Sequence, residues 1–110
     1  MIRAEFFADR DGLLTGYHIS GHSGFAESGQ DIICAFVSSA AYMTANTITD
    51  VMGIDAEAQV SEGDMRFMVA KKDAARCRDA LEGLRLHLLS TEEQYPEFLK
   101  VINTEVQCNA

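Results

Sequence analysis

Apolar residues alternate with polar ones at the start of the chain and again in its middle. In residues 2–9 the apolar positions on one side are Ile2, Ala4, Phe6 and Ala8. A period of two predicts a strand with one face buried and the other in solvent. Asp11-Gly12 then supplies a hairpin turn, so residues 13–20 are predicted to form the returning strand.

In the next part of the chain, residues typical of a loop are followed by residues typical of a helix. Residues 21–30 contain three glycines and two serines, which predicts a loop. Asp31 is a favourable N-cap and Gly53 a favourable C-terminal glycine, so a long helix is predicted between them. The 18 residues between Asp31 and Asp50 are uncharged, but six of them are Ser, Thr or Asn and no basic residue flanks them. This composition predicts a buried central helix rather than a membrane span.

The second half of the chain repeats the order of two strands and a helix. Alternation over residues 54–60 and 65–70, around a turn at Glu62–Asp64, predicts a second hairpin. Asp73 is predicted to cap a second helix. The apolar stripe of that helix is Cys77, Leu81, Leu84 and Leu88. Residues 99–106 are a candidate for a short terminal strand.

The resulting ββαββα order predicts an α+β fold. We expect two layers, with an antiparallel sheet of about four strands and two helices packed on one of its faces. At 110 residues the chain is long enough for one hydrophobic core, so residues 1–110 are predicted to form a single domain.

Charge and cysteine content narrow the classes of function. Lys and Arg number 9 against 17 Asp and Glu, and the formal net charge is -8. An acidic surface disfavours nucleic acids and anionic membranes, whereas it suits a basic partner. The acidic start of the chain does not have the pattern of a signal peptide, so we expect a cytoplasmic protein with reduced thiols. The three cysteines are too few and too scattered for a disulfide framework or a structural metal site, and no cofactor is expected.

One cysteine stands where a reactive thiol could form. If Asp31 caps the helix, Cys34 is the third helical residue, and the unpaired N–H groups of the first turn would stabilise its thiolate. Those N–H groups could also receive the oxyanion of an acyl-transfer intermediate. His22, at the other end of the loop, could serve as the general base if the loop brings its ends together.

Each of these residues also has a purely structural interpretation. Cys34 lies in an apolar stretch, where a cysteine is more often a small core residue. His18, on the preceding strand, could compete with His22 as the base, and Asp31 could either cap the helix or orient His22. The remaining candidates are expected to be bystanders: His87 on a helix surface, Cys77 in the core and Cys108 as an exposed thiol in the C-terminal tail.

The segment from the loop into the helix is similar to a known family signature. Residues 21–48 resemble the bacterial ribosomal-processing cysteine protease family (Prp), in which a Gly-His pair precedes Gly-x-Asp-(Ile/Val)-(Ile/Val)-Cys-Ala-x-Val-Ser. The matching residues are Gly21, His22, Gly29, Asp31, Ile32, Ile33, Cys34, Ala35, Val37 and Ser38. Weaker similarity continues in the Leu81–Leu84 segment and at Tyr95-Pro96, and Ser23 departs from an alanine that is common in the family.

The resemblance implies a cysteine endopeptidase that uses a dyad of Cys34 as nucleophile and His22 as base. Members of the family are homodimers that remove a short N-terminal extension from large-subunit ribosomal protein twenty-seven, after an aromatic-containing motif. The implied partner is therefore the basic N-terminal tail of a ribosomal protein precursor. Asp31 and Ser38 would support the site or the substrate.

The same resemblance gives the glycine-rich loop a role. Gly21, Gly24 and Gly29 would let residues 21–30 act as a mobile cover that closes over the substrate. A function of another class also fits the acidic surface, the small size and the uncharged helix: a non-catalytic dimeric module that binds ribosomes or ribosomal proteins.

Overall fold

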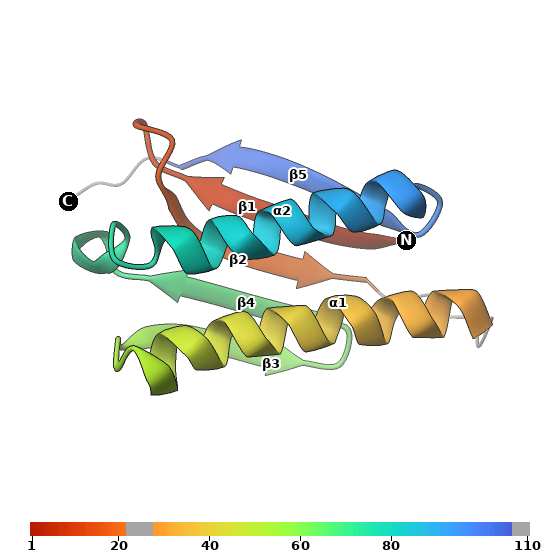
Figure 1. Cartoon of the computed structure of the whole chain (residues 1–110), viewed down its shortest axis with the longest axis horizontal. Helices are drawn as coiled ribbons and strands as arrows, with labels where there is room; N and C mark the ends of the chain where they lie inside the picture. The colour runs from red at the N-terminus through yellow and green to blue at the C-terminus, as the bar shows by residue number, and fades with distance from the viewer. Residues whose placement is uncertain (22–27, 107–110) are drawn as a thin grey trace.

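The computed structural model of the chain describes residues 1–21 and 28–106, and these residues form a single sheet covered by two helices (Figure 1). The strands and α-helices are β1 (Ile2–Ala8), β2 (Leu14–Ser20), α1 (Ser28–Asn46), β3 (Ala56–Ser61), β4 (Asp64–Val69), α2 (Arg78–Gln94) and β5 (Leu99–Glu105). A π-helical turn (Thr47–Val51) follows α1, and a 3₁₀ turn (Lys71–Asp73) follows β4. The α+β class and the predicted ββαββα order are confirmed, and the candidate terminal strand is present as β5, so the sheet has five strands where about four were predicted.

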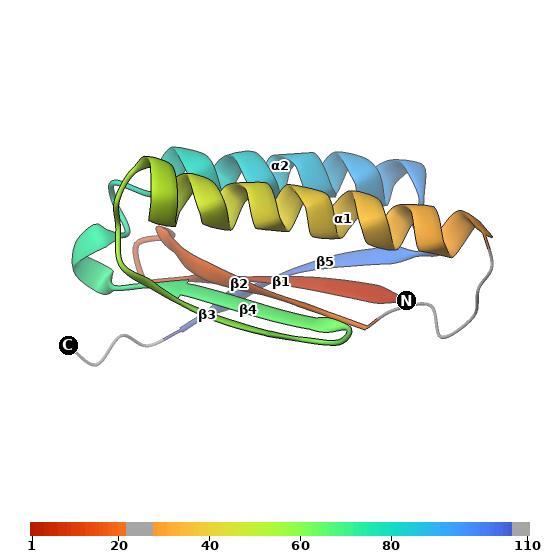
Figure 2. The ribbon, with the colours of Figure 1, turned by 90° about the horizontal axis from the view of Figure 1, so that it is seen from below.

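The sheet has five strands in the order β3-β4-β2-β1-β5, and both helices lie on the same face (Figure 2). The prediction of a wholly antiparallel sheet is wrong, because β5 pairs parallel to β1. The terminal strand follows a long crossover through α2, which returns the chain to the same end of the sheet from which β1 starts. The other strand pairs are antiparallel.

The core between the layers is built around a cluster of aromatic rings. Tyr17 and Phe67 are stacked with centroids 5.4 Å apart, Phe6 lies 6.0 Å from Tyr17, and all three side chains are fully buried. The Tyr17 hydroxyl donates a 2.7 Å hydrogen bond to the backbone carbonyl of Ala41 in α1. Burial raises the pKa of the Tyr17 phenol, so this group stays protonated and ties β2 to α1.

The first helix begins earlier than the sequence predicts. It starts at Ser28, so Asp31 is its fourth residue and not its N-cap. Residues 28–30 contain no proline, and each residue added to an established helix gains a backbone hydrogen bond, which favours extension in this direction. At the other end the prediction is confirmed, because Gly53 follows the π-turn with a positive φ of 70°.

The second helix begins later than predicted. Asp73 lies in the 3₁₀ turn, and α2 starts at Arg78, so the prediction that Asp73 caps it is wrong. The carbonyl of Asp73 accepts hydrogen bonds from the N–H groups of Arg76 and Cys77, which satisfies the turn before the α-helix starts. The apolar stripe is confirmed as core, since the side chains of Cys77, Leu81, Leu84 and Leu88 are all buried.

The uncharged helix is buried on one face only. Ile32–Val51 is long and apolar enough to cross a membrane, but core helices of soluble proteins can have the same length and composition. Here Ile33, Val37 and Ala41 pack into the core, whereas the opposite face of α1 remains exposed. The expectation of a central helix packed on the sheet is therefore confirmed for this inner face.

Candidate active site

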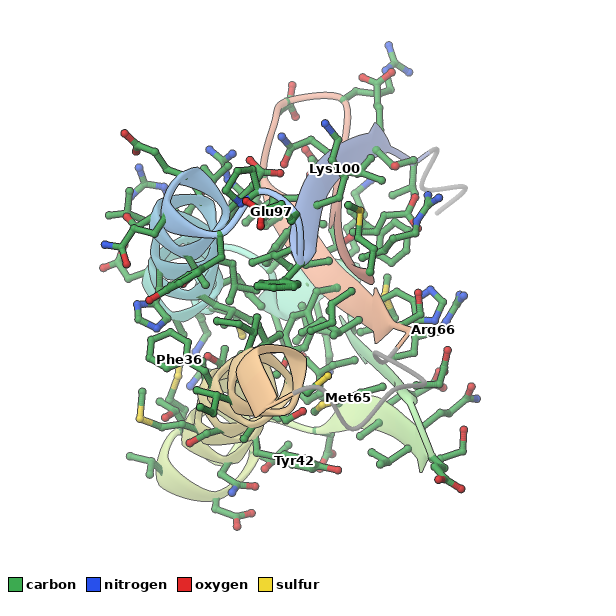
Figure 3. All side chains as sticks on the ribbon, turned by 90° about the vertical axis from the view of Figure 1, so that its right-hand side faces the viewer. Phe36, Tyr42, Met65, Arg66, Glu97 and Lys100 are labelled. Carbon is green, nitrogen blue, oxygen red and sulfur yellow. The ribbon has the colours of Figure 1, made fainter. Side chains whose placement is uncertain are left out.

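A pocket of about 290 Å³ lies where α1 passes the end of β2 and the turn between β3 and β4. Its walls are mostly apolar, and the lining residues that matter below are Cys34, Ser38, Tyr42, Val60, Glu62 and Met65. Ile2 of β1 also lines the pocket, so four separate parts of the chain meet at this one position. Figure 3 shows Met65 between α1 and the sheet, while Phe36 points away on the outer side of α1.

Cys34 is half-buried on the wall that α1 contributes, and it packs against the core. Ser38 lies one helical turn further along, so both side chains line the same wall. The position combines partial access with an apolar support, which a thiol needs if it is to meet a substrate in a fixed orientation. Cys34 and Ser38, which both belong to the family signature in the sequence, therefore line one pocket.

The helix start changes how the thiol can be activated. Cys34 is the seventh residue of α1 rather than the third, so the expectation that it lies in the first turn is wrong. The influence of a helix terminus falls off within its first turn. An interior residue also uses its own N–H group in the helix. The N-terminus of α1 is therefore not a source of thiolate or oxyanion stabilisation at Cys34.

The predicted base, His22, lies outside the described residues, as does Gly24 of the predicted loop. Gly29 lies within α1, and Gly21 lines the pocket at the end of β2. Gly21 has a φ of +84°, and a side chain there would come within 2.6 Å of the Met1 carbonyl oxygen, so glycine is required. Its N–H group donates to the carbonyl of Gly63, which fixes the end of β2 beside the β3–β4 turn.

His18 is not at the pocket. Neighbouring Tyr17 reaches α1, and side chains alternate along a strand, so His18 faces the side of the sheet away from the helices. There its Nε2 atom lies 2.7 Å from Asp64 Oδ1, and Arg66 approaches its Nδ1 atom at 3.4 Å. The possibility that His18 serves Cys34 as a base is therefore excluded by geometry.

The other candidates behave as bystanders where the structure describes them. The ring of His87 is exposed and stacks on Phe36, with centroids 5.0 Å apart. Cys77 is fully buried, and the pKa of its thiol is raised by burial and then by the negative charge of Asp73, so it stays protonated and inert. Cys108 lies outside the described residues. Within residues 1–21 and 28–106 no cluster of three or more His, Cys, Asp or Glu side chains is suited to a metal ion.

Part of the pocket could not be identified from the sequence. Tyr42 follows Cys34 by eight residues, so the helical period could have placed it near the same wall. Val60, Glu62 and Met65 carry no such signal, because only the packing of the β3–β4 hairpin beside α1 brings them to the thiol.

Comparison with known proteins agrees with this fold and shows the family. Residues 1–100 match the family model described as cysteine protease Prp. The ribosomal processing cysteine protease Prp of Bacillus subtilis is 27% identical over 107 residues, which cover 92% of this chain and 96% of that protein.

Solved structures show the same fold. The essential ribosomal processing protease Prp from S. aureus, in complex with a substrate peptide, matches with a TM-score of 0.85 at 20% identity, covering 94% of this chain and all of that one. The same protease with a covalently linked product peptide matches with a TM-score of 0.83 at 21% identity and the same coverage. Because the family model spans nearly the whole sequence, this chain belongs to the cysteine protease Prp family.

Proposed function

We propose that the chain is a cytoplasmic cysteine endopeptidase that removes the N-terminal extension of large-subunit ribosomal protein twenty-seven. The observation that carries the proposal is the accessible Cys34 thiol in a pocket lined by apolar side chains. The relative from S. aureus was solved with a substrate peptide and with a covalently linked product peptide, which supports nucleophilic catalysis in that protein. The substrate and the dyad are carried over from the family signature.

In the proposed reaction, His22 removes the proton from the Cys34 thiol as the sulfur attacks the carbonyl carbon of the scissile peptide bond. The carbonyl oxygen becomes an oxyanion, and the hydroxyl of Ser38 is a donor on the same wall of the pocket that could stabilise it. Protonated His22 then gives its proton to the leaving amine as the C–N bond breaks. Water, activated by the same imidazole, hydrolyses the thioester and restores the thiol. Asp31 is proposed to support this site.

The pocket is also suited to the side chain that precedes the cut. Its apolar walls include Val37, Ala41 and Met65, and a volume of about 290 Å³ accommodates one large side chain. This fits cleavage after an aromatic-containing motif. The net charge of -8 would favour encounter with a basic tail.

The proposal is tested with the native protein and a synthetic peptide that copies the extension and the first residues of mature ribosomal protein twenty-seven. We expect a single cut behind the aromatic motif, detected by mass spectrometry. A peptide with the same composition in scrambled order serves as the control. Equal cleavage of both peptides, or of neither, would contradict the proposed specificity.

We further propose that the enzyme is a homodimer that pairs through the outer faces of its helices. Exposed apolar side chains lie along this face, and they include Ile32, Phe36, Met43 and Leu86. A groove of about 630 Å³ runs between α1 and α2, and its lining is mainly apolar. Exposed apolar side chains that lie together often mark an interface between subunits.

The dimer is tested by light scattering coupled to size-exclusion chromatography. The native protein is expected to elute at twice the mass of the chain. Met43→Glu places a charge on the groove and should shift the protein to the monomer, whereas Lys100→Glu, on an exposed position of β5, should leave the dimer intact. A monomeric native protein would contradict this part of the proposal.

A further inference from the structure

The two edge strands of the sheet differ in whether a side chain bonds to their outward backbone groups. At the β5 edge, the outward N–H group of Val101 donates a 2.7 Å hydrogen bond to the carboxylate of Glu92 in α2. At the β3 edge, the described residues place no side chain on the outward backbone groups. An uncovered edge is a template on which another extended chain can pair.

The hydrogen-bond pattern shows which groups of β3 face outward. Gly63 accepts from the Gly21 N–H group, so Gly63 and every second residue after it bond toward β2. The residues between them, Asp64, Arg66 and Met68, therefore bond toward β3. Their partners in β3 are Ser61, Gln59 and Glu57. The outward N–H and C=O groups consequently belong to Ala56, Ala58 and Val60.

This open edge leads directly into the pocket of the thiol. Val60 and Ser61, at the end of β3, line the same pocket as Cys34, and Val60 is 52% exposed. Six residues of strand span about 20 Å, which gives an extended chain room to make several backbone hydrogen bonds before it reaches the thiol.

The charge of the edge fits one kind of chain. The segment from Asp55 to Asp64 contains four carboxylates and no basic residue. Asp55, Glu57 and Glu62 are exposed, so their charges face solvent, whereas Asp64 is half-buried and pairs with His18. An extended segment that carries Lys or Arg would gain from pairing here, whereas an acidic one would be repelled.

We propose that the substrate binds by strand addition to the outer edge of β3, as a sixth strand of basic character that delivers the scissile bond to Cys34. This inference rests on the proposed function and adds how the substrate is held. Backbone pairing along β3 would supply affinity and register, while the apolar pocket selects the side chain next to the cut.

A proline at one outward position tests the proposal. Ala58→Pro removes an outward N–H group and adds a ring on the edge, while the bonds between β3 and β4 are kept. We expect a rise of at least about 3- to 10-fold in KM for the extension peptide, since one hydrogen bond is lost and the proline ring obstructs the approach of the added strand. The rate of Cys34 alkylation by iodoacetamide and the Tm should stay near those of the native protein. Asn103→Pro, at an outward position of the β5 edge, is the matched control and should leave KM unchanged.

The peptide supplies a second, independent readout. N-methylation of single amides away from the scissile bond should weaken cleavage at every second position only, because only alternate amides of an added strand face β3. Cleavage by the native protein with no effect of Ala58→Pro and no such alternation would overturn strand addition but leave the proposed function intact. If the native protein does not cleave the peptide, the proposed function fails and strand addition fails with it.

Discussion

Replacing Cys34 by alanine is expected to lower kcat/KM for the extension peptide by at least about 10⁴-fold, because the reaction loses the atom that forms the thioester. His22→Ala should produce a loss of similar size, since residues that act as one catalytic unit do not contribute additively. Because Cys34 does not lie at a helix N-terminus, the proposed mechanism requires the imidazole of His22 to supply more of the thiol activation than the sequence suggested. Peptide cleavage followed by chromatography measures both variants.

Cys77→Ser is the matched control for the loss of a thiol. Cys77 is fully buried at the N-terminus of α2 and does not line the pocket of Cys34, so the variant should lose stability but keep kcat/KM for its folded fraction. Alkylation mapped by mass spectrometry gives a second check, with label on Cys34 and none on Cys77 in the native fold. Full activity of Cys34→Ala would contradict the proposed nucleophile.

Phe67→Ala is expected to have the largest effect on stability. The ring is fully buried in β4 and stacks on Tyr17, so its removal leaves a cavity between the sheet and the helices. Such truncations cost about 3–5 kcal/mol, out of a total stability of about 5–15 kcal/mol. The Tm should fall by at least about 12 °C for a domain of this size.

Thermal unfolding followed by circular dichroism measures this change. Val51→Ala, at a side chain that is 80% exposed, is the control and should alter stability by less than about 0.5 kcal/mol. Equal losses in the two variants would contradict the central position of Phe67. Because Phe67 does not line the pocket, the effect on kcat of the folded fraction should be small.

Local sequence patterns were sufficient to predict most of the strands and helices. The alternation in residues 2–9 and the stripe of Cys77, Leu81, Leu84 and Leu88 depend on which face of a strand or helix is apolar, and that is a property of neighbouring residues. Helix starts were predicted less well, as Asp31 and Asp73 show. A good capping residue stabilises a start but does not prevent the chain from extending the helix or delaying it when other backbone bonds compensate.

The sequence by itself determined the order of strands and helices, the buried stripes and the pair of residues, Cys34 and Ser38, that one helical turn places on a common wall. Only the tertiary structure decided the rest of the pocket. The parallel β5, the exclusion of His18 from the site and the arrival of Val60 and Met65 beside Cys34 depend on contacts between segments distant in the chain. Such contacts form where the sheet and the helices pack together to bury apolar surface. The spacing of apolar residues within one segment does not predict which distant segment it will contact.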